Sequence, residues 1–328
     1  MARRLREKDF SISVWNRSSE KAHSLVAEES GSTCIAAETA ATALAQCAEQ
    51  ALVIIIVYDT NAVLDVLQQD GVAAALTGKT LVNLTSANPD EGRAIAKELS
   101  KLGAGQVPFV DGGFSGAPAK ARSGTGQIFA SSSQKNVVEE VTPVLSCLGS
   151  VSYCGDIGAS RAIDYGVVDL FFVNLLSFMS NSASLEREGV DMNVYFQEAA
   201  KRLATVPAAL EIYSKRMATR NAETYNANVT VTLDTSRSYW AGRLPYNHAH
   251  GIPSHLAKLF VQLLDQARGG DGAPHGSADL SRLQEVVRYG ADSSRDGGED
   301  KESKRAKVIF ITGLVLGIVI GSTRSKGV

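Results

Sequence analysis

The segment that most constrains the fold is Leu52–Tyr58, whose sequence LVIIIVY is apolar along its whole length. A strand with one face in water alternates apolar and polar residues, whereas a strand covered on both faces does not. The segment therefore predicts a central strand with helices packed on both sides of its sheet. This arrangement is typical of a doubly wound α/β domain with a mostly parallel sheet.

Short apolar runs alternate with helical spacing through the first half of the chain, which supports this fold class. We expect a Rossmann-like domain over residues 1–154. Besides the central strand, its predicted strands are Ser11–Trp15, Thr80–Leu84, Gln106–Val110 and Gly126–Ala130, and its predicted helices include Ala62–Gln69 and Pro89–Leu102.

After Gly158 the strand signals nearly disappear and the apolar spacing becomes helical. A long helix is predicted from Ala159 to about Leu185, and residues 155–289 are expected to form an all-helical second domain that begins with it. The other predicted helices are Asn193–Thr205, Pro207–Ser214, Asp234–Ala241, Ser254–Ala267 and Ser277–Tyr289.

Residues 290–328 differ from both domains: a charged linker is followed by an apolar tail. As a helix, the uncharged run Val308–Thr323 would be too short to cross the ~30 Å hydrocarbon core of a bilayer. Three interpretations stay open: a membrane tail anchor, a packed terminal segment, and an artefact of the gene prediction. Membrane contact is not favoured, so we expect a cytoplasmic protein, with a tail-anchored one as the alternative.

Charge and metal-ligand patterns exclude two other classes of function. The 33 basic and 35 acidic residues nearly cancel, so no overall field would recruit nucleic acid. The four cysteines lack metal-ligand spacing, and His248, His250 and His255 gather without acidic or cysteine ligands nearby. We expect no metal site.

The turn Trp15-Asn16-Arg17-Ser18 follows a predicted strand, where dinucleotide-binding folds read the adenosine ribose. An acidic residue there favours NAD, whereas Arg17 and the Ser18 hydroxyl suit the extra phosphate of NADP. The alternative is a solvated turn arginine. In such folds a strand and a glycine-rich loop come first, but Met1 opens directly into a helical segment. We therefore expect an N-terminally truncated form that lacks a central strand, which leaves an open edge on the neighbouring strands.

Five segments occur in the order and spacing of a known family: WNRSSEKA, LVIIIVYD, LVNLTSANPDEGRAIAKEL, FVDGGFSGAPAKARSGTG and GDIGASRAIDY. From Met1 to about Tyr289 the chain resembles the β-hydroxyacid dehydrogenase superfamily, with its 6-phosphogluconate dehydrogenase-like NADP-binding domain. It resembles in particular the imine reductases and reductive aminases. The resemblance implies an NADP-dependent oxidoreductase and a homodimer whose active site is built from two subunits.

The resemblance also implies roles for residues of the first domain. Tyr58 and Asp59 fall on a loop that, in members of the family, lies beside the nicotinamide of the cofactor. Asn83 falls on the loop near the nicotinamide ribose. The alternative for Asn83 is a capping or turn residue ahead of the next helix. Ser115 and Gly116 fall on the substrate-binding stretch, where the alternative is that small residues allow tight packing.

Asp164, six residues after Gly158, occupies the position of the catalytic lysine of the hydroxyacid dehydrogenases, and Val168 that of their asparagine. An acidic group suits stabilisation or protonation of an iminium nitrogen, so Asp164 points to an imine reductase. Phe172 replaces the tyrosine usual in reductive aminases, which favours reduction of a preformed imine. The alternative for Asp164 is a solvated helix acid, or one paired with Arg161.

Trp240 is expected to line a substrate pocket or a contact between subunits. The sequence thus predicts NADPH-dependent reduction of a C=N bond, or of a related C=O bond, in a small molecule such as one of secondary metabolism. Two alternatives stay open: a catalytically inactive relative that cannot bind NADPH, and a hydroxyacid-dehydrogenase-like enzyme with an altered catalytic residue. The glycine-rich loop is absent from the sequence, and this absence keeps the catalytically inactive relative among the alternatives.

Overall fold

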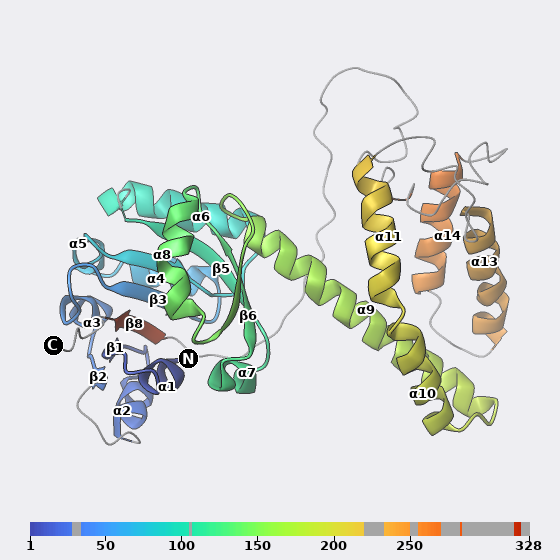
Figure 1. Ribbon diagram of the computed structural model, residues 1–328, viewed down its shortest axis with the longest axis horizontal. Helices are drawn as coiled ribbons and strands as arrows, with labels where there is room; N and C mark the ends of the chain where they lie inside the picture. Colours follow the sequence, from blue (N-terminus) through green and yellow to red (C-terminus); the bar gives the residue numbers. More distant parts are fainter. Residues whose placement is uncertain are drawn as a thin grey trace, which may run out of the picture. The chain divides into compact units, whose positions relative to one another are not determined.

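The chain divides into two compact units in a computed structural model (Figure 1). The structure describes residues 1–27, 34–104, 107–219, 233–249, 255–269, 283 and 318–322. One unit comprises Met1–Phe171 with Val308–Val328, and the other comprises Phe172–Lys307. The division lies inside a single long helix, whereas the sequence suggested a boundary after residue 154 and a separate tail.

The first unit is a Rossmann-like α/β domain, as predicted. Its larger sheet has the strand order β7-β6-β5-β4-β3-β8, and β1 and β2 form a separate parallel pair. Neighbouring strands of the larger sheet are parallel except in the pairs β5–β6 and β3–β8. The strands are β1 (Ile12–Val14), β2 (Cys34–Ala36), β3 (Leu52–Ile56), β4 (Thr80–Asn83), β5 (Phe109–Ser115), β6 (Gly126–Ser131), β7 (Gly149–Tyr153) and β8 (Ile318–Ser322).

Strand β3 is covered on both faces, which confirms the prediction from its continuous apolar sequence. Leu52 and Ile54 belong to one apolar core, and Val53 and Ile55 to another, because successive side chains of a strand point to opposite faces. Helices α1 (Ala2–Arg6), α2 (Ser19–Ala27) and α8 (Lys135–Leu145) contribute to the first core. Helices α3 (Ala40–Ala45), α4 (Thr60–Leu67), α5 (Val72–Ala75) and α6 (Pro89–Leu99) contribute to the second.

Besides β8, the structure extends the predicted strand list at β2, at β7 and at the end of β5. Strands β2 and β7 were not predicted, because β2 has only three residues and the sequence of β7, GSVSY, is largely polar. Strand β5 starts later than predicted and runs on to Ser115 through Gly112 and Gly113, two residues that sequence rules disfavour in strands. A π-helical turn, η1 (Ser100–Ala104), follows α6, and α7 (Pro118–Ser123) lies between β5 and β6.

The outer edge of β3 is paired with β8, so the open edge expected from the sequence is not observed. The two strands run antiparallel, with Ile54 opposite Ile320 and Leu52 opposite Ser322. Figure 1 shows β8 beside β1. In the sheet order, β8 and β4 lie on opposite sides of β3. Part of the apolar tail therefore adds a strand to the sheet, which agrees with the packed-segment interpretation.

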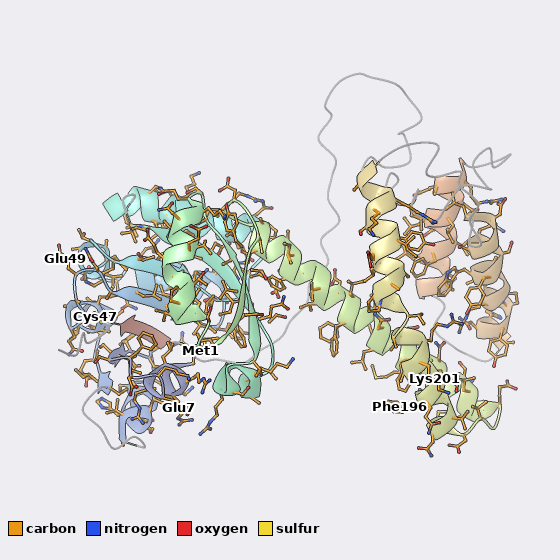
Figure 2. All side chains as sticks on the ribbon, viewed as in Figure 1. Met1, Glu7, Cys47, Glu49, Phe196 and Lys201 are labelled. Atoms are coloured by element: carbon orange, nitrogen blue, oxygen red, sulfur yellow. The ribbon has the colours of Figure 1, made fainter. Side chains whose placement is uncertain are left out.

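Every described element of the second unit is helical, as predicted. The elements are the later part of α9 (Ala159–Arg187), then α10 (Met192–Leu203), α11 (Val206–Thr219), α13 (Leu233–Ala249) and α14 (His255–Arg268). Helices α13 and α14 are joined by an ion pair between Arg237 Nε and Asp265 Oδ1 at 2.8 Å. Phe196 on α10 is 62% exposed (Figure 2). The predicted helix Ser277–Tyr289 lies outside the described residues except for position 283.

Helix α9 exposes an unusual amount of apolar surface. By length and composition alone it could cross a membrane, and none of its most apolar window is buried. Scattered exposed apolar residues need no explanation, but a continuous apolar surface marks a contact with another body. The exposed residues include Leu170, Phe171, Phe172, Val173, Leu175, Leu176 and Met179.

Candidate active site

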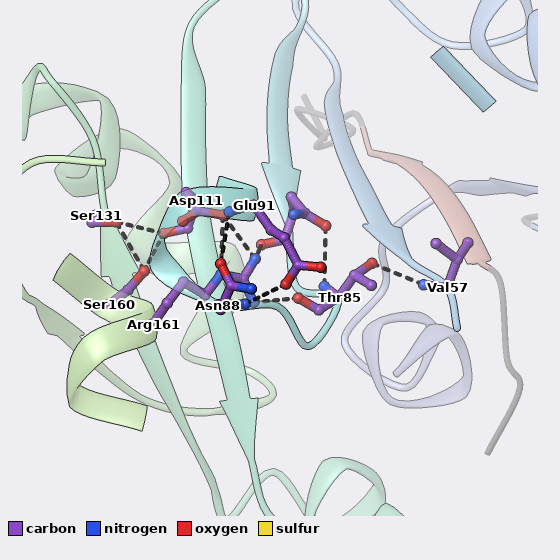
Figure 3. Close-up of polar contacts among 9 residues, drawn as sticks. Val57, Thr85, Asn88, Glu91, Asp111, Ser131, Ser160 and Arg161 are labelled. Carbon is purple, nitrogen blue, oxygen red and sulfur yellow. Dashed lines mark hydrogen bonds and ion pairs between the residues drawn. The ribbon is translucent and has the colours of Figure 1, made fainter. Parts of the chain in front are cut away.

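A fully buried ion pair joins the start of α9 to the central sheet (Figure 3). Arg161, in the first turn of α9, and Asp111, on β5, expose 1% and 0% of their side chains. Arg161 donates to Asp111 Oδ1 from Nη2 at 2.7 Å and from Nε at 3.1 Å. A buried charge is tolerated when it is paired and hydrogen-bonded, and Asp111 Oδ1 meets that requirement, whereas Asp111 Oδ2 has no hydrogen-bond partner among the described residues.

The same guanidinium also binds the backbone at the carboxyl end of β4. Nη1 donates to the Thr85 carbonyl, and Nη2 lies 3.4 Å from the Asn83 carbonyl. The hydroxyls of Ser131 and Ser160 both donate to the Asp111 carbonyl, at 3.0 and 2.9 Å. The first turn of α9 is therefore fastened to β4 and β5 by buried polar contacts.

Helix α6 completes the wall around Asp111. Asn88 and Glu91 form a capping box, in which the Glu91 N–H donates to Asn88 Oδ1 at 2.9 Å and the Asn88 N–H donates to Glu91 Oε2 at 2.7 Å. One position along, Gly92 faces Asp111 so closely that a methyl group there would collide with Oδ2. This close approach explains why glycine is needed in the middle of a helix.

Asp164 lies one helical turn beyond Arg161 and rests on β5. A Cβ added to Gly113 would lie 3.3 Å from Asp164 Oδ2, and within the described residues Asp164 Oδ1 is buried without a hydrogen-bond partner. Burial raises the pKa of the Asp164 carboxyl, against smaller opposite effects of the Arg161 guanidinium and the Ser115 hydroxyl. Such a carboxyl can hold a proton or place a negative charge beside a cation.

The partner of Arg161 differs from the one considered from the sequence. Arg161 makes its ion pair with Asp111, and its charge lowers the pKa of Asp164 from a distance. The sequence had offered a pairing of Arg161 with Asp164 as the structural alternative to a catalytic role. With Arg161 engaged elsewhere, Asp164 retains a buried oxygen that no described residue satisfies.

Asn83, at the end of β4, is fully buried. One polar atom of its side chain stabilises a turn, and the other is a hydrogen-bond donor without a described acceptor. Its Oδ1 accepts a hydrogen bond from the Thr85 N–H at 3.1 Å, as the turn-residue alternative expects. Its Nδ2 is buried without a partner among the described residues. Because buried polar groups are nearly always satisfied, this amide is a position at which a ligand could accept a hydrogen bond.

The residues after β3 divide between surface and structure. Tyr58 is 44% exposed. Asp59 is the N-cap of α4, and its Oδ1 accepts from the Ala62 N–H at 2.8 Å. The capping contact accounts for Asp59 without a ligand, while Tyr58 lies open to one.

The turn after β1 borders a cavity of about 720 Å³. Asn16 is buried and its Oδ1 accepts from the Ser18 N–H at 2.9 Å, whereas Arg17 and Ser18 are exposed on the same turn. The cavity suits an anion, because the cationic side chains of its lining outnumber the single acidic one, Glu20. Its lining includes Trp15, Asn16, Arg3, Arg4, Lys21 and Arg122.

The predicted substrate residues fall into both units. Ser115 ends β5 beside Asp164, and Gly116 follows with φ of 147°, a conformation that favours glycine. Phe172 is 45% exposed on α9, in the second unit. Trp240 stacks on Phe260 with ring centroids 4.7 Å apart, which gives it a packing role in the helical unit.

The structure thus brings together some predicted residues and adds others. Asp164 and Ser115 lie together, and Arg161, one helical turn before Asp164, contacts the Asn83 carbonyl. Sequence reasoning did not identify Asp111 or Gly113 as site residues, although both lie in the quoted segment FVDGGFSGAP; a charged residue inside an apolar strand was the available signal. Among the described residues, no three His, Cys, Asp or Glu side chains gather as a metal site.

Residues 1–158 match the family described as the NAD binding domain of 6-phosphogluconate dehydrogenase. A 3-hydroxyisobutyrate dehydrogenase-like protein of Arabidopsis thaliana is 31% identical over 47% of this chain, a region that spans only about half (48%) of that relative. An NADPH-dependent reductive aminase of Aspergillus oryzae is 25% identical over 88% of this chain and 93% of its own length. An imine reductase structure from Bacillus cereus superposes with a TM-score of 0.73, covering 88% of this chain and 94% of its own at 25% identity.

Proposed function

We propose, on the premise that residues 1–158 form an NAD binding domain of the 6-phosphogluconate dehydrogenase type, that this protein reduces a C=N bond of a small imine or iminium compound with NADPH. Reduction of a related C=O bond belongs to the same proposal. The observation that carries it is the Asp164 carboxyl, which lies on Gly113 at the carboxyl-terminal part of β5 with one buried oxygen unpartnered. Open parallel sheets bind their ligands outside the carboxyl ends of the strands.

The chemistry follows from the charge of an iminium substrate. NADPH, when bound, supplies the hydride that adds to the electrophilic carbon. The Asp164 carboxylate places a negative charge near a cationic nitrogen, and in its protonated form it can give its proton to a neutral imine nitrogen. Burial raises the pKa of Asp164, so that its proton is held at a higher pH than that of an exposed carboxyl.

The preference for an imine over a hydroxyacid as substrate rests on the residues that replace the lysine and asparagine of the hydroxyacid dehydrogenases. The hydroxyacid dehydrogenases that the chain resembles use a lysine at position 164 and an asparagine at 168, where this chain has Asp164 and Val168. An ionised carboxylate cannot donate to a carbonyl oxygen as an ammonium group does, but it can stabilise a cationic nitrogen. The near full-length similarity to a protein named as a reductive aminase supports the same preference.

The residues around the turn after β1 support NADPH as the cofactor. Arg17 and Ser18 can hold the 2′-phosphate, since both are exposed beside a cavity rich in cationic side chains. Asn16 holds the turn in place through its contact with the Ser18 N–H. Asn83 Nδ2, Tyr58 and Asp59 remain proposed contacts on the nicotinamide side, and Ser115, Gly116, Phe172 and Trp240 proposed substrate contacts.

The exposed apolar surface of α9 supports assembly into a homodimer. Residues such as Leu170, Phe171 and Leu176 would leave water if a second copy covered this helix. The same surface would fit a bilayer, but α9 begins with a buried ion pair inside the α/β unit. We therefore propose a cytoplasmic dimer, with membrane attachment of residues 308–323 as the alternative that subcellular fractionation separates.

The experiment that tests the proposal measures binding and turnover on the full chain. Titration with NADPH should quench tryptophan fluorescence, and a cyclic imine should then cause NADPH consumption. Asp164→Asn should bind NADPH with unchanged affinity but turn over far more slowly, whereas Asp169→Asn, an exposed acid on the same helix, should behave as wild type. Absence of NADPH binding would favour the catalytically inactive alternative, and normal turnover by Asp164→Asn would remove Asp164 from its role.

A further inference from the structure

We propose that Arg161 is a positioning residue for the reaction: its ion pair with Asp111 fixes the first turn of α9 so that the Asp164 carboxyl stays on Gly113. Arg161 itself is enclosed by the protein and is not placed against a ligand. The inference rests on the proposed function in that it takes Asp164 to be the reacting acid.

The geometry around Arg161 is that of a rigid clamp. Its guanidinium contacts one carboxylate oxygen through two nitrogens, and the Thr85 and Asn83 carbonyls through the remaining directions. These partners come from β5 and from the end of β4. A planar group held on several sides leaves little freedom for the helix turn that carries it.

The helix transmits this restraint to Asp164. Residues three apart on a helix are neighbours on its surface, so a shift of the Arg161 turn moves the carboxyl with it. The start of α9 is also seated closely: Gly158 has φ of 92°, and a Cβ there would lie 3.0 Å from the Pro89 carbonyl oxygen. First turns of helices otherwise fray, because their N–H groups lack partners within the helix.

The close contact between Asp164 and Gly113 on β5 makes the position of the Asp164 carboxyl important. A Cβ on Gly113 would be 3.3 Å from Asp164 Oδ2, so the carboxyl and the strand backbone are already in close contact. The charge of Arg161 opposes the effect of burial, which raises the pKa of the Asp164 carboxyl. The charged or titratable groups that act on Asp164, on its neighbour Tyr165 or on Arg161 are Arg161, Tyr165 and Asp169 on α9, Asp111 on β5 and Glu91 on α6.

Two substitutions separate the position of Arg161 from its charge. Arg161→Gln removes both the charge and the clamp, and it should lower kcat about 10- to 100-fold because small displacements of a reacting group have large effects on rate. KM for the imine and Kd for NADPH should change little. Arg161→Lys keeps the charge and should recover part of kcat. Lys135→Gln, which removes an exposed ion pair with Glu139, is the matched control and should leave all three constants unchanged.

A readout independent of turnover follows the Asp164 carboxyl itself. Its carbon-13 resonance, assigned by its loss in Asp164→Asn, reports its pKa in an NMR titration. The pKa should rise in Arg161→Gln, stay close to wild type in Arg161→Lys, and not change in Lys135→Gln. An unchanged Asp164 pKa together with unchanged kcat in a folded Arg161→Gln protein would overturn the inference.

The two measurements keep the inference and the proposed function separate. If the wild type reduces no imine, the proposed function fails, while the NMR titration still decides whether Arg161 controls Asp164. If Arg161→Gln does not fold, the double variant Asp111→Asn/Arg161→Gln removes both buried charges and takes its place. A folded double variant with the wild-type Asp164 pKa would overturn the inference, and a raised pKa with lowered kcat would support it.

Discussion

Arg161 donates two hydrogen bonds, at 2.7 and 3.1 Å, to the same oxygen of Asp111, while the other oxygen of Asp111 faces Gly92 on α6. One carboxylate therefore connects α9, β5 and α6 inside the α/β unit. Neither residue is exposed to solvent, so the pair organises the interior and the group that can meet a substrate is Asp164, one turn further along α9.

Loss of the Asp111 carboxylate should destabilise the α/β unit strongly. Asp111→Ala leaves the Arg161 charge buried without its counter-ion, and breaking a buried pair in this way costs about 3–5 kcal/mol. Urea unfolding followed by circular dichroism measures the loss. Glu139→Gln, which breaks the exposed pair with Lys135, is the control and should change the free energy of unfolding by less than about 0.5 kcal/mol. Equal small effects of the two changes would contradict the clamp.

The contact between Gly92 and Asp111 predicts an unusual response to alanine. Alanine normally stabilises a helix relative to glycine, but at position 92 the added methyl group would meet Asp111 Oδ2. Gly92→Ala should therefore lower the free energy of unfolding by about 1–3 kcal/mol, as overpacking does. At Gly166 on α9 a Cβ meets nothing within 4 Å, so Gly166→Ala should raise it by about 0.5–1 kcal/mol. Thermal unfolding of both variants shows whether the signs differ.

The raised pKa of Asp164 predicts that this carboxyl, which we propose takes part in the reaction, lowers the free energy of unfolding at neutral pH. Burial raises this pKa above the ordinary 3.8, so the folded state binds the proton more tightly than the unfolded state and stability falls as pH rises through the folded pKa. Asp164→Asn does not titrate and escapes this loss. Its free energy of unfolding should exceed that of wild type at neutral pH, and the difference should shrink as pH falls through the raised folded pKa towards 3.8, where both states bind the proton. Asp169→Asn should show no such difference.

A constant difference between wild type and Asp164→Asn across that pH range would contradict the raised pKa. Urea denaturation at a series of pH values gives the required free energies directly. The comparison does not depend on any substrate, so it tests the environment of Asp164 separately from its chemical role.

Arg17 should decide between the two nicotinamide cofactors. Its guanidinium is exposed on the turn after β1, where a 2′-phosphate would lie. Arg17→Ser should weaken NADPH binding about 10- to 100-fold, as expected for the loss of hydrogen bonds between charged groups, and leave NADH binding nearly unchanged. Fluorescence titration with both nucleotides measures the ratio. An equal loss for NADH and NADPH would indicate that Arg17 does not read the phosphate.

The fold was predictable where one residue pattern had one physical meaning. The apolar run Leu52–Tyr58 identified a strand covered on both faces, and helical spacing after Gly158 identified the long helix. Strand β2 was missed because three residues carry too little pattern. Strand β8 could not be predicted, because an apolar run near a chain end is equally compatible with a membrane or with the edge of a sheet.

The sequence led to individual residues of the candidate site but not to the contacts between them. The family resemblance pointed to Asp164, whose chemical role stays a prediction, and the structure places it beside Ser115. The partner of Arg161 could not be read from the sequence, because Asp111 lies far away along the chain and Asp164 is the nearer acid. Long-range contacts of this kind depend on the sheet order, which local patterns do not specify.

Deuteride transfer is the most direct test of imine reduction by NADPH with the help of Asp164. The full chain is given NADPH carrying deuterium on the transferred position and a cyclic imine, and mass spectrometry follows the amine product. We expect one deuterium at the former imine carbon for each nucleotide oxidised, at a rate that falls sharply in Asp164→Asn and not in Asp169→Asn. Amine without deuterium, or labelled amine formed equally fast by Asp164→Asn, would contradict it.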